Sequence, residues 1–273
     1  MRSHEPSNAV ALLASDLDGT LIPVDEDPDH ADAVARLRER LAARPGLRLA
    51  YVTGRDHDDA LAAVAACGLP RPHVLACDVG TGISWADGDA WRRDHEYHDR
   101  ARAAMGEATA AGILAAVTGD SAFLPQDESH QSDVKISFRL PASADADAAL
   151  EAARQSLAGR GWRLALVSSR CVFTDDLLLD VLPGGIDKAT AVQHIRKALR
   201  LDVGAVMYAG DSGNDLAPLT AGFNAVVVGN AAPELADRIR DFAAAEGRAG
   251  SVHIASRPHL HGVLEGAARF GIL

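Results

Sequence analysis

The chain has 273 residues, enough for one large domain or two smaller ones. Hydrophobic residues make up 48% and charged residues 24%, as in globular proteins, which excludes disordered, collagen-like and coiled-coil classes. With 38 acidic and 27 basic side chains the net charge is −11, so the chain would repel a phosphate backbone and we expect no nucleic-acid partner.

The number and spacing of the cysteines and the hydropathy of the chain indicate in which cellular compartment we expect the protein. Cys67, Cys77 and Cys171 form no CxxC pair and no disulfide framework, which indicates a reducing compartment. The first eight residues are polar, and the apolar run behind them leads into acidic residues, so we expect no signal peptide. No window holds the ~20 unbroken apolar residues of a membrane-spanning helix. The sequence predicts a cytoplasmic protein without a membrane partner and leaves the oligomeric state open.

In the first eighty residues, short apolar runs alternate with longer stretches of helical period. This alternation predicts strands at 9–14, 47–52 and 73–76 and helices at 31–43 and 58–67. Strands that alternate with helices are typical of a parallel, doubly wound sheet.

The middle of the chain follows a different pattern. Over 133–140 apolar and polar residues alternate with a period of two, which predicts an antiparallel strand with one face in water. Helices near 100–116 and 145–157 and strands near 163–168 and 177–182 complete this unit. We interpret it as an inserted α+β domain.

After residue 182 the pattern of the first eighty residues returns. The architecture expected is therefore an α/β, Rossmann-like doubly wound core made of residues 1–84 and 183–273, with a second domain inserted at 85–182. The elements expected in the second part of the core are a helix at 188–199, a strand at 205–209, a helix from about 215, a strand at 225–228 and a helix at 234–244.

Polar segments follow three of the expected core strands directly: DLDGT at 16–20, TGR at 53–55 and GDSGND at 210–215. Ligands of an open parallel sheet gather beyond the carboxyl ends of its strands, so these segments share one crevice. Asp, Gly and Asn also form ordinary turns after strands. Three such segments at successive strand ends favour a site.

Four carboxylates converge on this crevice, those of Asp16, Asp18, Asp211 and Asp215. They would repel one another unless a cation neutralises them, and oxygen ligands without His or Cys favour Mg²⁺. A hard cation beside glycine-flanked amides and a threonine hydroxyl suits a phosphoryl group, which an aspartate can attack at phosphorus.

Lys188 follows an N-cap residue, Asp187, and so falls in the first turn of a helix. A cation is disfavoured there by roughly 0.3–1 kcal/mol, and a bound anion would reverse that cost. A solvated lysine that tolerates the cost is an equally good interpretation.

These segments in this order, with the insert between the second and the lysine, resemble the haloacid dehalogenase (HAD) superfamily with a C2-type cap. Further segments resemble sucrose-phosphate phosphatases and related disaccharide-phosphate phosphatases. They are DVGTGI (78–83), VKISFRL (134–140), LLLDVLPGGIDKATAVQHI (177–195), VVVGNAAPEL (226–235) and ASRPHLHGVLEGAARFGIL (255–273).

The resemblance implies an Mg²⁺-dependent phosphatase that hydrolyses a sugar phosphate, such as sucrose 6-phosphate, through an aspartyl phosphate. Asp16 would be the nucleophile, and Asp18 would protonate the leaving oxygen and then activate water. The residues implied to hold the phosphoryl oxygens are Thr53, Gly54 and Lys188. The residues implied to hold the metal are Asp16, Asp18 through its carbonyl, Asp211 and Asp215, with Asn214 in support.

Substrate contacts are less defined. The family commonly has Glu where this chain has Gly82, so a carboxylate that could accept hydroxyl hydrogen bonds is absent. Arg55 could reach substrate, although an ion pair with Asp56 or Asp58 is the favoured interpretation.

Two further candidate substrate contacts are Thr81 and Lys135, although most polar strand faces such as that of Lys135 meet only water. Trp85 and Trp91 could stack on a sugar or pack at the entrance to the insert. The histidines at 259 and 261 lack a third ligand at metal-binding spacing, so we expect them to be solvated or hydrogen-bonded.

Three alternatives remain open. The chain could hydrolyse another small sugar or polyol phosphate, it could be a phosphomutase, or it could be a non-catalytic module that binds a sugar phosphate to regulate a glycosyltransferase. The last alternative predicts loss of catalytic residues, whereas this chain carries the full set.

Overall fold

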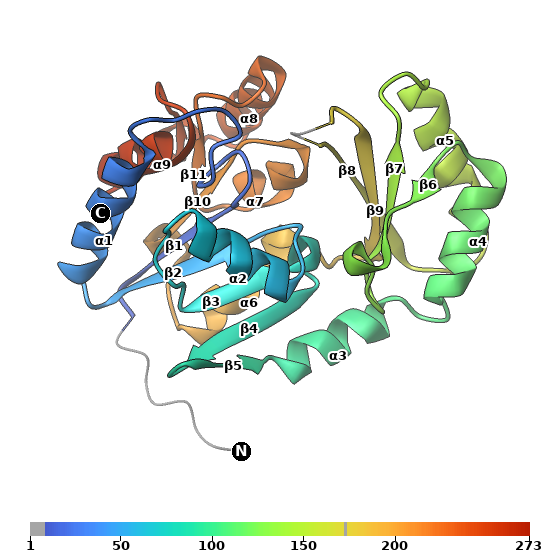
Figure 1. The fold of residues 1–273 in the computed structure, drawn as a ribbon, viewed down its shortest axis with the longest axis horizontal. Helices are drawn as coiled ribbons and strands as arrows, with labels where there is room; N and C mark the ends of the chain where they lie inside the picture. The colour runs from blue at the N-terminus through green and yellow to red at the C-terminus, as the bar shows by residue number, and fades with distance from the viewer. Residues whose placement is uncertain (1–8, 172–173) are drawn as a thin grey trace.

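The computed structural model describes residues 9–171 and 174–273 (Figure 1). The polar segment 1–8, for which no signal peptide is expected, lies outside these residues. The described chain forms an eight-stranded sheet of order β12-β11-β10-β1-β2-β3-β4-β5 and a four-stranded sheet of order β6-β7-β9-β8. The two sheets lie side by side, with the smaller one on the right in Figure 1.

The larger sheet is parallel over six neighbouring strands, and all of them except the edge strand β12 are largely buried because helices cover both faces. Near-continuous apolar runs such as LLA in β1 follow from this burial. The parallel strands are β1 (Ala11–Ser15), β2 (Leu47–Val52), β3 (Val74–Cys77), β10 (Val206–Gly210), β11 (Asn224–Val227) and β12 (Val252–Ile254).

Two hydrophobic cores lie on opposite faces of this sheet, as expected for a doubly wound fold. The helices packed in the first core are α1 (His30–Ala42), α2 (His57–Ala66) and α9 (His259–Arg269). The helices packed in the second core are α3 (His95–Ala104), α6 (Lys188–Ala198), α7 (Leu216–Thr220) and α8 (Pro233–Ala245).

An antiparallel hairpin extends the larger sheet beyond β3. It consists of β4 (Gly82–Asp87) and β5 (Ala90–Arg93), joined at Gly88, which has a φ of +58°. The boundary expected at residue 85 therefore falls inside β4, and 85–93 belong to the larger sheet. A hairpin needs only a short turn and no helical crossover, so it left no α/β pattern in the sequence.

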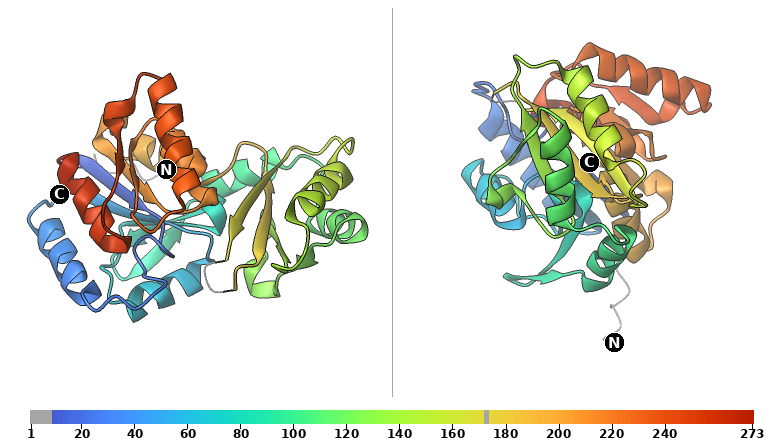
Figure 2. Two further views of the ribbon diagram at one scale, coloured as in Figure 1. Left: turned by 90° about the horizontal axis from the view of Figure 1, so that it is seen from above. Right: turned by 90° about the vertical axis from the view of Figure 1, so that its right-hand side faces the viewer.

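The smaller sheet is antiparallel, as the alternation at 133–140 predicts. Its strands are β6 (Leu124–Pro125), β7 (Ile136–Leu140), β8 (Leu164–Arg170) and β9 (Leu177–Pro183). The helices α4 (Ala110–Asp120) and α5 (Ala146–Leu157) cover its outer face, away from the larger sheet (Figure 2). Its other face is therefore turned toward the core.

A single helix near 100–116 was expected, and this is wrong. The segment contains the end of α3 and the start of α4, separated by Gly106 at a φ of +66°. Asp94 caps α3 and Thr109 caps α4, each by accepting a backbone N–H, so two start signals flank the break. Within the described ranges, none of the helices has the length and apolar character needed to cross a membrane.

Candidate active site

Three of the four predicted carboxylates meet at the carboxyl ends of β1 and β10. These strands are neighbours in the sheet, so Asp16 and Asp211, each the first residue after its strand, lie side by side. Carboxylate oxygens of Asp16, Asp211 and Asp215 all lie within 4.8 Å of one another, and the three residues are at most 9% exposed. Convergent sequence segments thus become a compact acidic cluster.

The cluster is electrostatically unfavourable without a cation. Burial, reinforced by the charge of Asp215, raises the pKa of Asp16 well above its usual value. Burial and the same neighbour raise the pKa of Asp211 to about 7, although the Thr20 hydroxyl donates a 2.6 Å hydrogen bond to Asp211 Oδ1 and opposes the shift. A hard divalent cation with oxygen ligands would remove this repulsion, so the donor set fits Mg²⁺.

Lys188 is buried in the cluster and is not a solvated lysine. It begins α6, and its Nζ lies 3.0 Å from Asp16 Oδ2, 2.8 Å from Asp215 Oδ1 and 2.7 Å from Asn214 Oδ1. Burial opposes its charge, but the two carboxylates outweigh burial and raise the pKa of Lys188 above its usual value. The ammonium group therefore stays charged beside Asp16.

Asp215 holds its neighbours in place. Its Oδ1 accepts from Lys188 and, at 2.6 Å, from the Tyr208 hydroxyl, while its Oδ2 accepts from the backbone N–H groups of Asp211 and Ser212 at 3.1 Å. These four contacts occupy its acceptor positions, so Asp215 supports Lys188 and Asp211 more directly than it could hold a metal. The sequence analysis did not single out Tyr208; its only signal is one hydroxyl inside a buried strand.

Asp18 is turned toward Arg55. Its two carboxylate oxygens accept from Arg55 Nε and Nη2, each at 2.7 Å, and Arg55 Nη1 donates to Asp59 Oδ2 at 2.7 Å. The expected ion pair of Arg55 with Asp56 or Asp58 is wrong, because Asp56 instead caps α2 by accepting from two backbone N–H groups.

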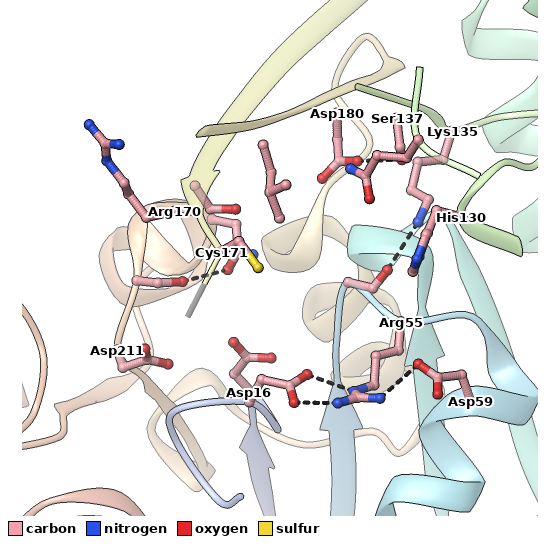
Figure 3. A pocket seen from close by; sticks show the side chains of 17 residues that line it. Asp16, Arg55, Asp59, His130, Lys135, Ser137, Arg170, Cys171, Asp180 and Asp211 are labelled. Carbon is pink, nitrogen blue, oxygen red and sulfur yellow. Dashed lines mark hydrogen bonds and ion pairs between the residues drawn. The ribbon is translucent and has the colours of Figure 1, made fainter. Parts of the chain in front are cut away.

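A cavity of about 340 Å³ lies above the carboxylates, between the two sheets (Figure 3). The predicted site residues that line it are Asp16, Asp18, Gly54, Arg55, Lys135, Asp211 and Asn214. The predicted site residues outside its lining are Thr53, Thr81, Lys188 and Asp215, all fully buried. Thr53 Oγ1 accepts from the Arg55 N–H, and Thr81 Oγ1 donates to the Asp78 carbonyl, so both hydroxyls stabilise loops.

Lys135, just before β7, and Ser137 within it face the cavity, so the expectation that this face meets water is wrong for these two residues, whereas Arg139 farther along β7 is exposed. Lys135 and Ser137 are 2% and 1% exposed. Lys135 Nζ lies 3.0 Å from the Gly54 carbonyl oxygen (Figure 3). It also lies 3.0 Å from Asp78 Oδ1, which follows β3 of the larger sheet. The Ser137 hydroxyl donates to Asp180 Oδ1 at 2.6 Å.

The smaller sheet and its loops supply several lining residues that the sequence analysis missed. Asp180 had a readable signal, a carboxylate within the apolar strand β9. Ser137 belonged to the alternating face of β7, and Ser169, Arg170 and Leu178 also lie in strands, but strand periodicity does not show which face meets a cavity. Residues outside the strands, such as Gln126, had no periodic signal at all. The missed residues from this unit are Gln126, His130, Ser137, Ser169, Arg170, Cys171, Leu178 and Asp180.

Gly82 lines a different cavity, together with Trp91 and Asp78. In this structure, the position where the family commonly has Glu is therefore not over the carboxylates. Trp91 packs against the first core under the Arg71 guanidinium, and Trp85 Nε1 donates to Asp94 Oδ2 at 3.0 Å. Of the two expectations for these tryptophans, stacking on a sugar or packing, the structure therefore supports packing.

Gly19 has a φ of +76°, and an added Cβ would collide with the Asp211 carboxylate. Its carbonyl accepts from Asn230 Nδ2 at 2.8 Å, a support that the sequence analysis missed. We expect Gly19→Ala to displace Asp211 and lower kcat/KM about 100-fold. Gly88→Ala is the control, because Gly88 has a similar φ of +58° with nothing within 4 Å. Equal activity of the two variants would contradict the expected collision.

The fold and the acidic cluster define the class of protein: an α/β protein with the HAD fold, which carries paired aspartates after its first strand and an acidic motif after a neighbouring strand. The chain belongs to the sucrose-6F-phosphate phosphohydrolase family, whose model matches residues 9–271. This membership agrees with the resemblance seen in the sequence.

Three individual proteins are similar to this chain in sequence or structure. The sucrose-phosphatase of Synechocystis sp. PCC6803, solved in complex with sucrose and phosphate, has a TM-score of 0.81 at 27% identity and covers 96% of this chain and 98% of its own. The mannosylfructose-phosphate phosphatase of Agrobacterium fabrum is 32% identical over 82% of this chain and 85% of its own. A protein of Nitrosococcus oceani classed as a HAD-like hydrolase is 31% identical over 82% of this chain, which spans 60% of that relative's length.

Proposed function

We propose that this protein is an Mg²⁺-dependent phosphatase that hydrolyses a sugar phosphate, specifically a disaccharide monophosphate such as sucrose 6-phosphate. The observation that carries the proposal is the contact of Asp16 with Lys188 beside Asp211, at the base of a cavity closed on its other side by polar residues of the smaller sheet. The substrate class is supported by two relatives, a sucrose-phosphatase and a mannosylfructose-phosphate phosphatase.

In the proposed reaction Asp16 attacks phosphorus, so that an oxygen–phosphorus bond forms on Asp16 as the bond to the sugar oxygen breaks. The Leu17 N–H donates to Asp16 Oδ1 at 2.8 Å and fixes the carboxylate. Asp18 protonates the departing sugar oxygen and then takes a proton from the water that releases phosphate. Arg55 orients Asp18 through its two hydrogen bonds.

The phosphoryl group is held by groups around Asp16. Lys188 balances its charge, and Gly54, on a loop braced by Thr53, lines the same cavity, where its backbone N–H would donate to a phosphoryl oxygen. Asp16 and Asp211 would hold Mg²⁺ with the Asp18 carbonyl, supported by Asn214 and Asp215. When bound, the ion neutralises charge on the phosphoryl oxygens.

We further propose that the unit from α4 to β9 is a cap that selects the sugar. Lys135 links it to the phosphate-binding loop, and Ser137 and Asp180 present hydroxyl and carboxylate groups to the cavity. A carboxylate accepts hydrogen bonds from sugar hydroxyls, and a serine hydroxyl can both donate to them and accept from them. Closure of a cap excludes water until transfer.

We expect Asp180→Asn to raise KM about tenfold with a small change in kcat, because it removes an acceptor for a substrate hydroxyl but leaves the carboxylate cluster intact. Steady-state kinetics on the preferred sugar phosphate measures both constants. Asp241→Asn, an exposed substitution on α8, is the matched control. A fall in kcat at unchanged KM would place Asp180 in the chemical step instead.

Phosphate release from a panel of sugar phosphates tests the proposed activity. With Mg²⁺ we expect the highest kcat/KM for a disaccharide monophosphate, with monosaccharide and polyol phosphates as comparisons. Following the phosphate by NMR separates hydrolysis from transfer to another position. Absence of phosphate release from every substrate would favour the non-catalytic module. A preference for a polyol phosphate would mean that the proposed cap selects a polyol and not a sugar.

A further inference from the structure

A second cavity, of about 250 Å³, lies between α1 and α9. These helices pack against each other on the side of the larger sheet far from the smaller sheet, at the left of Figure 1. None of its described lining residues also lines the catalytic cavity. The two cavities are therefore separate features of the molecule.

Three arginines line this second cavity. Arg36 and Arg40 lie one turn apart on α1, and Arg257 lies just before α9. Within residues 9–171 and 174–273, none of the three forms an ion pair with a carboxylate. The Arg36 side chain makes a long 3.4 Å hydrogen bond to the Asp32 backbone carbonyl. All three residues are exposed, so their guanidinium groups are free to meet an anion that enters the cavity.

The acidic residue in the cavity lining does not balance these charges. Glu265 Oε1 lies 2.8 Å from His253 Nε2, and Glu265 Oε2 accepts from the Ser256 hydroxyl at 2.8 Å. Both oxygens also accept from the Ser256 backbone N–H at 3.1 Å. The carboxylate is thus committed to the segment before α9, and the arginines remain available to a ligand.

A buried histidine supplies an independent observation that points to a ligand. His261 lines the same cavity, is 5% exposed, and its ring has no hydrogen-bond partner within the described part of the chain. Its Nε2 lies 3.5 Å from Asp27 Oδ2, which leaves Nδ1 unengaged. A buried polar atom without a partner costs about 1–3 kcal/mol, so a ligand that paired with this ring would be stabilised.

We propose that this cavity binds a small oxyanion with at least two negative charges, of the phosphate class. Guanidinium groups present paired N–H donors that match phosphate oxygens, and His261 supplies a further donor at the wall. The cavity is smaller than the one over the carboxylates, and its concave shape keeps His261 out of reach of a flat acidic protein surface. The site does not depend on the proposed catalytic function.

Calorimetric titration with inorganic phosphate tests this site, using chelator-treated protein at constant ionic strength. We expect the wild-type chain to bind phosphate saturably, and Arg40→Gln/Arg257→Gln to bind it at least tenfold more weakly. Arg238→Gln/Arg269→Gln removes the same charge from exposed positions outside the cavity and should bind as the wild type does. An unchanged melting temperature without phosphate shows that each variant is folded.

Several outcomes would overturn the site. Unchanged affinity in Arg40→Gln/Arg257→Gln would assign the bound phosphate to the catalytic cavity. Equal losses in both double variants would mean that only overall charge attracts the anion. Absence of saturable phosphate binding, or binding of an acidic peptide in its place, would also contradict the proposal. None of these results would contradict sugar-phosphate hydrolysis, because the arginines lie outside the carboxylate cluster.

Discussion

Asp16→Asn is expected to lower kcat for phosphate release at least about 10⁴-fold while the protein remains folded, because an amide cannot form the acyl phosphate. The substitution keeps the size of the side chain. Burial and the neighbouring carboxylates already raise the pKa of Asp16, so a neutral group at this position relieves repulsion from Asp211 and Asp215. The loss of activity should therefore not come from unfolding.

The geometry also predicts a local cost of this substitution. In the wild type one Asp16 oxygen accepts from the Leu17 N–H and the other faces Lys188 Nζ at 3.0 Å. Asparagine has a single acceptor oxygen, so its amide must point at one of these two donors. We expect the melting temperature to change only modestly, because relieved repulsion offsets this mismatch.

Activity and thermal unfolding of the same preparation separate these effects. Asp237→Asn, exposed on α8, is the control and should retain full activity. Substantial turnover by purified Asp16→Asn would remove Asp16 as the nucleophile. Loss of activity together with loss of the cooperative thermal transition would show that the variant had unfolded and would contradict the expected separation of the two properties.

The sequence predicted the parallel sheet and the acidic cluster for a common reason. Apolar runs that alternate with helical stretches predict parallel strands, whose carboxyl ends lie at one edge of the sheet, and Asp16 and Asp211 each follow such a strand. Both inferences depend on backbone topology, which hydrophobic periodicity encodes. The short strand β12 and the helix α9 were absent from the prediction, although Leu260, Val263 and Ala267 of α9 are buried at helical spacing.

Side-chain partners were less predictable, because they depend on which surfaces meet in three dimensions. The alternation in β7 identified Lys135 and Ser137 as one face but could not show that the core covers it. Proximity in sequence suggested Asp56 or Asp58 as the partner of Arg55. The partner in the structure that faces the cavity is Asp18, 37 positions away at the end of the neighbouring strand β1.

Asp211→Asn is expected to lower kcat/KM about 1,000-fold and, without metal, to stabilise the protein at neutral and alkaline pH. The first effect follows from the loss of the charged group that we propose as a ligand for Mg²⁺ beside the proposed nucleophile Asp16, an electrostatic contribution of several kcal/mol. The second follows from the buried cluster, where Asp211 in its charged form is repelled by Asp215. One substitution should thus change activity and stability in opposite directions.

The raised pKa of Asp211 determines how the stability of the metal-free protein changes with pH. The pKa of Asp211 is about 7 in the folded protein against a usual 3.8, so between these values the unfolded chain has released a proton that the folded chain still holds. The free energy of unfolding of the metal-free wild type therefore falls as pH rises from about 4 to 7, by up to about 4 kcal/mol from this group. Asparagine does not titrate, so the advantage of Asp211→Asn should grow through this range and level off above it.

Urea unfolding in a chelator at pH 5, 6, 7 and 8 measures this difference, with Asp241→Asn as an exposed control that should follow the wild type. Adding Mg²⁺ at pH 8 should raise the stability of the wild type more than that of Asp211→Asn, because an ion bound to the folded state alone stabilises it by mass action. Parallel pH curves for the wild type and Asp211→Asn, with equal responses to Mg²⁺, would mean that the cluster carries no repulsion for a cation to relieve. The assignment of the carboxylates to a metal would then lose its physical basis, whatever the activity of the enzyme.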